Sequence, residues 1–165
     1  MNIGVYGIGL PRSGTTSLKS ALKTLGYIPG KTCFVGDQMC LPLDKFKTLD
    51  RTHPDAKFIF THRKSAETWL SSVNKRTPII EKNPAILRQR KAMYGSEKVI
   101  PEIYLPIYYQ REVEVRNYFL QEYPEDVNEK LLCMCFEKGH GWQELCSFLN
   151  KLVPKESFPH KNRSK

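Results

Sequence analysis

The chain has 165 residues, which is long enough for one domain with a buried core. Its net charge of +9 favours an anionic ligand, substrate or surface, although a merely solvated basic surface would give the same value. Zinc-ligand spacing and RNP-like aromatic motifs are both missing, so we expect no nucleic-acid partner.

The five cysteines follow no disulfide-framework pattern, and there is no signal peptide and no apolar run of transmembrane length. These features predict a cytoplasmic protein. Cys133 and Cys135 lie in an apolar run, which favours a buried strand over a metal site. We expect a single domain over residues 1–160 and a disordered basic tail over 161–165.

Apolar periodicity, capping residues and breakers predict the order of the elements. We expect, in chain order, a strand over 3–8, a helix over 16–25, a loop-rich stretch over 26–42, a short helix over 44–51, a strand over 56–61, a helix capped by Ser65 and running to about Lys75, irregular chain over 77–106, a long helix over 107–122, a strand over 130–135 and a helix over 142–149.

Strands that alternate with helices predict an α/β fold, a three-layer sandwich with a central, mostly parallel sheet. In such folds ligands bind beyond the carboxyl ends of the strands. The loops that follow the strands 3–8 and 56–61 are therefore the places to look for binding residues.

The loop after the first strand looks like a phosphate-binding loop that lacks its lysine. Gly9 and Gly14 have the spacing of the glycines in G-x-x-x-x-G-K-[ST], and Thr16 takes the hydroxyl position. Thr15 stands where the lysine belongs, and the cation has moved to Arg12. A glycine loop that leads into a helix points backbone N–H groups at an anion, so we expect phosphate or sulfate binding here.

Two other interpretations of this loop remain. A dinucleotide-binding loop would carry a third glycine where Gly7-x-Gly9-x-x-Arg12 has arginine. A glycine-rich turn before an ordinary helix would carry no function at all.

A second anion site is predicted after the strand over 56–61. Arg63 follows this strand, and Ser71 lies eight residues later, about two turns into the next helix. The two side chains could hold a second phosphate, separate from the one at Arg12. Taken alone, each residue would also fit an ordinary surface position.

Three parts of the chain resemble the sulfotransferases that use 3′-phosphoadenosine 5′-phosphosulfate. Residues 11–18 (PRSGTTSL) are similar to the 5′-phosphosulfate loop of that family, with arginine in place of the lysine of cytosolic members. Residues 57–63 (KFIFTHR) and 69–73 (WLSSV) resemble the 3′-phosphate segment. Residues 141–149 (GWQELCSFL) are similar to the ending of one branch of the family.

The resemblance implies a P-loop-like sulfotransferase fold, 3′-phosphoadenosine 5′-phosphosulfate as the donor, and no metal. The acceptor would be a small molecule or a glycan with a hydroxyl or amine. The implied cofactor-binding residues are Pro11, Arg12, Ser13, Gly14, Thr15, Thr16, Ser17, Arg63 and Ser71.

Three residues are implied as catalytic. Arg12 would stabilise the charge on the leaving phosphate and on the transferred group. Asp37 best matches the place of the family's general base, and His140 is a second candidate. His53 reads as a turn residue, and His62 as a loop residue that could contact the cofactor.

Two further functions remain open. A small nucleoside or metabolite kinase would share the sheet and the loop, but it needs the lysine that Thr15 replaces. A non-catalytic relative could keep the nucleotide pocket and bind a polyanion or a partner through its basic surface.

Overall fold

The computed structural model describes residues 4–160, except for the side chain of Asp37. Four strands form one sheet in the order β2-β1-β3-β4, and every neighbouring pair is parallel. The strands are β1 (Val5–Gly7), β2 (Cys33–Val35), β3 (Lys57–Thr61) and β4 (Leu131–Met134). All four carboxyl ends therefore lie at one edge of the sheet.

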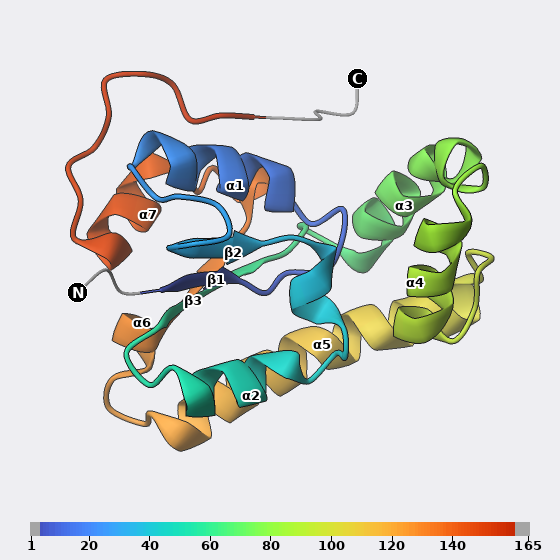
Figure 1. The fold of residues 1–165 in the computed structure, drawn as a ribbon, viewed down its shortest axis with the longest axis horizontal. Coiled ribbons are helices and arrows are strands. Elements are labelled where there is room, and N and C mark those ends of the chain that lie inside the picture. Colours follow the sequence, from blue (N-terminus) through green and yellow to red (C-terminus); the bar gives the residue numbers. More distant parts are fainter. Residues whose placement is uncertain (1–3, 161–165) are drawn as a thin grey trace.

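Helices cover both faces of the sheet, which confirms the predicted three-layer sandwich (Figure 1). Helices α1 (Thr15–Thr24) and α7 (Trp142–Leu149) pack on one face, where Leu18, Leu22 and Leu145 are fully buried. Helix α2 (Lys45–Thr52) and the second half of α5 (Pro101–Glu122) pack on the other, through Phe46 and Phe119. Short helices complete the chain: η1 (Asp37–Cys40), α6 (Val127–Lys130) and η2 (Phe136–Lys138).

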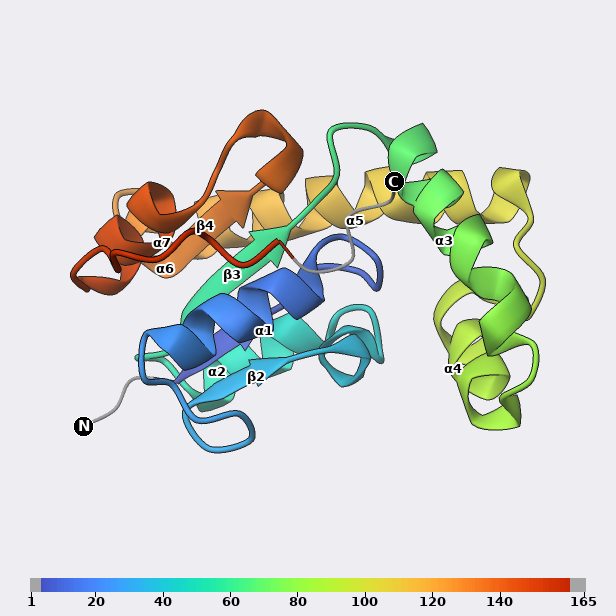
Figure 2. The ribbon, with the colours of Figure 1, turned by 90° about the horizontal axis from the view of Figure 1, so that it is seen from above.

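A helical lobe stands beyond the carboxyl ends of the strands (Figures 1 and 2). It consists of α3 (Ala66–Ile80), α4 (Pro84–Tyr94) and the first half of α5. Trp69 is fully buried at its centre, and its ring lies 4.8 Å from that of Tyr108 and 6.2 Å from that of Tyr104. This aromatic cluster fixes the lobe against the edge where ligands are expected.

Most predicted elements are confirmed within a few residues, and the side chain of Ser65 caps α3 by accepting the Thr68 N–H at 3.2 Å. The irregular chain predicted over 77–106 is wrong. It contains the end of α3, all of α4 and the start of α5. Pro84 and Pro101 open helices at their first positions, where a missing N–H costs nothing, so they do not interrupt regular structure as prolines inside a helix often do.

The loop predicted over 26–42 contains β2, a strand of three residues on the sheet edge. After α7, the chain runs in extended form over the α1 and α7 side (Figures 1 and 2). Phe158 anchors this segment against the rings of Trp142 and Phe136, at 4.9 and 5.1 Å. The predicted tail 161–165 lies outside the described residues. Among residues 4–160, no helix has both the length and the apolar character needed to cross a membrane.

Candidate functional site

The loop between β1 and α1 adopts a backbone conformation that few side chains allow. Arg12 has a φ of 71° and Gly14 a φ of 105°, both in the left-handed region. A Cβ on Gly14 would also lie 2.6 Å from the ring of Phe136. Glycine is therefore required at this position, and the resulting turn carries Arg12 to the carboxyl edge of the sheet.

Ser13 belongs to the internal framework of this loop. Its N–H and its hydroxyl both donate to the Leu10 carbonyl, at 3.1 and 2.6 Å, and its Oγ lies 2.9 Å from Thr61 Oγ1. The side chain is buried. Both donors of Ser13 bond to the protein and Ser13 does not line the cavity described below, so its assignment to cofactor binding stays a prediction.

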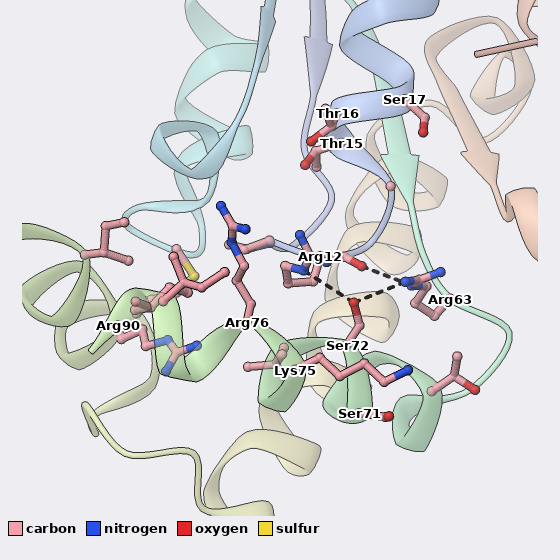
Figure 3. Close-up of a pocket in the computed structure, with 18 of the residues that line it drawn as sticks. Arg12, Thr15, Thr16, Ser17, Arg63, Ser71, Ser72, Lys75, Arg76 and Arg90 are labelled. Carbon is pink, nitrogen blue, oxygen red and sulfur yellow. Dashed lines mark hydrogen bonds between the residues drawn. The ribbon is translucent and has the colours of Figure 1, made fainter. Parts of the chain in front are cut away.

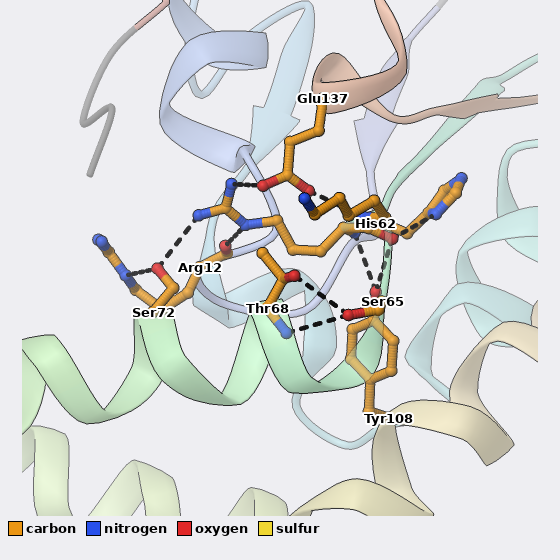
Figure 4. Close-up of polar contacts among 9 residues, drawn as sticks. Arg12, His62, Ser65, Thr68, Ser72, Tyr108 and Glu137 are labelled. Carbon is orange, nitrogen blue, oxygen red and sulfur yellow. Dashed lines mark hydrogen bonds and ion pairs between the residues drawn. The ribbon is translucent and has the colours of Figure 1, made fainter. Parts of the chain in front are cut away.

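Arg63 joins three segments around the loop, through the residues Arg12, Ser72 and Glu137 that Figure 4 labels. Its Nε donates to the Arg12 carbonyl at 3.0 Å, and its Nη2 donates to Ser72 Oγ at 3.2 Å. Its Nη1 forms an ion pair with Glu137 Oε1 at 2.9 Å. The arginine therefore braces the β1–α1 loop against α3 and η2.

The backbone at Arg63 is held as firmly as its side chain. Its N–H donates to the Tyr108 hydroxyl at 2.9 Å, and that hydroxyl donates to the Arg63 carbonyl at 3.3 Å. Burial raises the pKa of Tyr108 to about 12, so the hydroxyl keeps its proton. The next N–H, of Lys64, donates to Glu137 Oε2 at 2.8 Å.

Helix α3 holds the loop through two side chains that the sequence did not single out. Trp69 Nε1 donates to the Pro11 carbonyl at 2.8 Å, and Ser72 Oγ accepts from Arg12 Nε at 3.3 Å. Ser72 is buried and lies one residue after the predicted Ser71. Ser72 follows Trp69 by three residues, so the two side chains lie on one helix face. This spacing is the sequence feature that could have indicated Ser72.

A cavity of about 1180 Å³ opens between the loop and the helical lobe. All of the predicted cofactor-binding residues except Ser13 line it, namely Pro11, Arg12, Gly14, Thr15, Thr16, Ser17, Arg63 and Ser71. The start of α1 has no side-chain cap from the described residues, and its first turn carries no acidic residue. The partial positive charge of this helix end therefore faces the cavity.

Cations lie on two sides of Arg12 (Figure 3). Arg63 and Ser71 lie on one side, and Lys75 extends from α3 in the same direction. Arg76 and Arg90 lie on the other side. The sequence motifs indicate Arg63 and Ser71, but they do not indicate Lys75, Arg76 or Arg90.

The predicted histidines lie elsewhere. His140 does not line the cavity, and its Nδ1 accepts the Cys135 N–H at 3.1 Å; its assignment as a catalytic base stays a prediction. His62 is also outside the cavity lining, and burial lowers the pKa of its imidazole. His53 ends α2, as a turn residue would. His160 is the one of the four histidines that lines the cavity.

Asp37 opens η1 directly after β2, so its backbone lies at the carboxyl edge of the sheet, while its side chain lies outside the described part. Its role as a base stays a prediction. Glu67 and Glu137 are described carboxylates that line the cavity. Within the described part of the chain, no cluster of three His, Cys, Asp or Glu residues is arranged to hold a metal ion.

Comparison with known families identifies the class of protein. A family model described as a sulfotransferase domain matches residues 4–46 and 39–165. The chain therefore belongs to the sulfotransferase family and is an enzyme of that class, as the resemblance of its loops implied. A search of curated proteins gives no match.

Proposed function

We propose that the protein transfers the sulfuryl group of 3′-phosphoadenosine 5′-phosphosulfate to a hydroxyl or amine of a small-molecule or glycan acceptor. The observation that carries this proposal is the pair of neighbouring cations in one cavity, Arg12 in the loop and Arg63 before α3, whose side chains both donate to Ser72 Oγ. A donor phosphorylated at both its 3′ and 5′ positions matches two such cations. A cytoplasmic location remains a prediction.

The 5′ end of the donor would lie at Arg12 and the first turn of α1. When bound, the donor supplies an activated sulfuryl group. Arg12 presents fixed N–H donors to the phosphate oxygen on which charge grows during transfer. The N–H groups at the start of α1 add to this stabilisation, and the hydroxyls of Thr15 and Thr16 line the same wall.

The 3′-phosphate would lie at Arg63, Ser71 and Lys75. Arg63 donates three hydrogen bonds within the protein, to Arg12, Ser72 and Glu137. A guanidinium has five N–H groups, so two remain for a ligand. The Ser71 hydroxyl and the Lys75 ammonium lie on the same side of the cavity and supply further donors.

Calorimetry with 3′-phosphoadenosine 5′-phosphate and with adenosine 5′-phosphate tests the two-site arrangement. A charge-assisted hydrogen bond contributes about 1.5–3 kcal/mol, so loss of the 3′-phosphate should weaken binding by about tenfold or more. Lys75→Met should lower affinity for the 3′-phosphorylated ligand only. Lys82→Met, at an exposed lysine outside the cavity lining, is the matched control.

Equal affinity for the two nucleotides would contradict the second phosphate site. Tight binding of ATP with magnesium, and activity that EDTA abolishes, would favour the kinase alternative. Binding without transfer to any acceptor in a panel would favour the non-catalytic alternative. We expect transfer to proceed in EDTA, because Arg12 and the start of α1 supply the positive charge that a kinase takes from magnesium.

We also propose Asp37 as the base that takes the proton of the acceptor. The position of η1 after β2, at the same edge of the sheet as Arg12, supports this assignment. Asp37→Asn should lower the turnover number by about a hundredfold or more, within the usual contribution of a general base, and leave nucleotide affinity within about twofold. His160→Gln is the comparison variant, and turnover lost there but kept in Asp37→Asn would transfer the role to His160.

A further inference from the structure

Arg90 is a buried cation in the cavity wall, and it has no anionic partner among the described residues. Its side chain belongs to α4, is 6% exposed and lines the cavity on the side away from Arg63. Its Nη1 and Nη2 both donate to one hydroxyl, Thr77 Oγ1, at 3.2 Å each. Among the described residues, no carboxylate lies within ion-pair distance of Arg90.

Such an arrangement is costly in a protein that has no use for it. A buried charge is normally paired, because its loss of hydration is otherwise uncompensated. A single neutral hydroxyl satisfies two of the five N–H groups of a guanidinium. An anionic group in the cavity would supply the missing charge, and the guanidinium of Arg76 lies on the same side of Arg12 (Figure 3).

Apolar side chains line the cavity wall beside Arg90, together with the polar Arg76, Asn83 and Gln89. The apolar side chains come from the end of α3 and from α4, and they are Ile79, Ile80, Ile86 and Met93. Ile79 is 57% exposed although it faces a cavity. Ligand pockets with such a lining bury the apolar body of a small molecule and orient it through a few polar groups.

The size of the cavity leaves room for two ligands. Its volume of about 1180 Å³ exceeds the usual range of about 300–1,000 Å³ for a single drug-sized ligand. The nucleotide proposed above takes the side of Arg12, Arg63 and Ser71. The side of Arg76 and Arg90 is then available for the acceptor.

We propose that the acceptor is an anionic amphiphile, with its acid group at Arg90 and its apolar body against the isoleucines. The role of this amphiphile as the acceptor rests on the proposed function, whereas its binding at Arg90 does not. In transfer, the acceptor oxygen forms a bond to sulfur as the bond from sulfur to the 5′-phosphate oxygen breaks. The electron pair of the broken bond stays on that phosphate oxygen, and the hydroxyl proton passes to the base.

Calorimetry with two probes of one length tests the anion site. The probes are ω-hydroxydodecanoate and the neutral α,ω-dodecanediol, each titrated into the protein saturated with 3′-phosphoadenosine 5′-phosphate. We expect the acid to bind at least about tenfold more tightly than the diol, as one charge-assisted contact would give. Equal affinities in the native protein overturn the proposal, and this result needs no variant to fold.

Variants then place the acid group. Arg90→Met should lower the affinity for the acid by about tenfold or more and leave the affinity for the diol unchanged. Arg90→Lys should retain most of the affinity for the acid. Arg88→Met, two residues away on the exposed side of α4, is the matched control and should change neither. An unchanged affinity of folded Arg90→Met for the acid would contradict the assignment.

The apolar part is tested by chain length. The short acid γ-hydroxybutyrate should bind at least about tenfold more weakly than ω-hydroxydodecanoate, since it has fewer methylene groups to bury. Ile79→Ser, at an exposed position, should reduce this difference. Equal affinities for the two acids would mean that the site binds only a small anion, and would overturn the proposal that the ligand is an amphiphile. Acid binding that depends on Arg90 in a protein that does not bind the nucleotide would support this site and contradict the proposed donor.

Discussion

The backbone of Arg12 is in the left-handed region, and its side chain is the cation proposed to act in catalysis. A non-glycine residue in the left-handed region costs about 1 kcal/mol or more, and this strain persists because neighbouring groups hold the loop. Ser72 accepts from the Arg12 side chain, and Arg63 donates to its carbonyl. The guanidinium is thus placed in advance, which is how a fixed donor stabilises charge that appears during a reaction.

Arg12→Ala should therefore affect catalysis more than binding. We expect the turnover number to fall by about a hundredfold or more, as for other donors to a developing charge, while affinity for 3′-phosphoadenosine 5′-phosphate falls by about tenfold or less. Steady-state kinetics and calorimetry on the same preparation measure the two effects. Arg88→Ala is the control, and turnover within about threefold of the native enzyme would reduce Arg12 to a binding residue.

At the scale of elements, α3 positions the phosphate-binding loop. Its Ser65 cap sets where the helix begins, and this register brings Trp69 to the Pro11 carbonyl and Ser72 to both arginines. The helix is held in turn by α5, whose Tyr108 bonds to the backbone of Arg63. A substitution in α3 that removes one of these bonds should therefore alter the position of the phosphate-binding loop.

Trp69→Phe tests this coupling. The ring is kept but the bond from Nε1 to the Pro11 carbonyl is lost, so we expect the free energy of unfolding to fall by about 1–2 kcal/mol. Nucleotide affinity should fall severalfold, because the loop is less well placed. Tyr118→Phe loses a bond of 2.9 Å to the Asp50 carboxylate, at the end of the sheet opposite the cavity, and is the control for affinity. Unchanged affinity in Trp69→Phe would show that the loop is held without α3.

At the scale of the whole molecule, the end of the sheet opposite the cavity is stabilised by a buried polar network. Asp50 on α2 accepts hydrogen bonds from the hydroxyls of Tyr118 and Tyr123 and forms an ion pair of 3.1 Å with Lys130. Lys130 also donates to the Pro54 carbonyl. Burial and the bond to Asp50 raise the pKa of Tyr123 to about 12. The network joins α2 and the end of α5 to the end of α6, directly before β4.

Asp50→Asn leaves Lys130 buried without its counter-charge. We expect the free energy of unfolding to fall by about 3 kcal/mol, the lower part of the range for breaking a buried pair. Urea denaturation measures this, with the exposed Asp55→Asn as the control. The nucleotide affinity of the folded variant should be unchanged, because the network lies at the amino end of β3 and β4. A loss below about 1 kcal/mol would mean that the pair contributes little.

The sequence by itself determined the parallel α/β fold and the glycine loop with its displaced cation. It also indicated that Arg12, Arg63 and Ser71 lie at one edge of the sheet. These follow from local rules, since periodicity defines elements, glycine marks the turn, and the carboxyl ends of parallel strands meet at one edge. Local rules misread the prolines of 77–106, because a proline that opens a helix and one that breaks it look alike in one dimension.

Only the tertiary structure decided which side chains meet. Ser13 bonds inward to Leu10 and His140 to Cys135, although each is the kind of residue that binds or catalyses elsewhere. Ser72 matters because Arg12 and Arg63, which are distant in sequence, donate to it. Arg90 matters because it is buried with no carboxylate near it among the described residues. Burial and pairing are properties of the packed molecule, and no spacing along the chain records them.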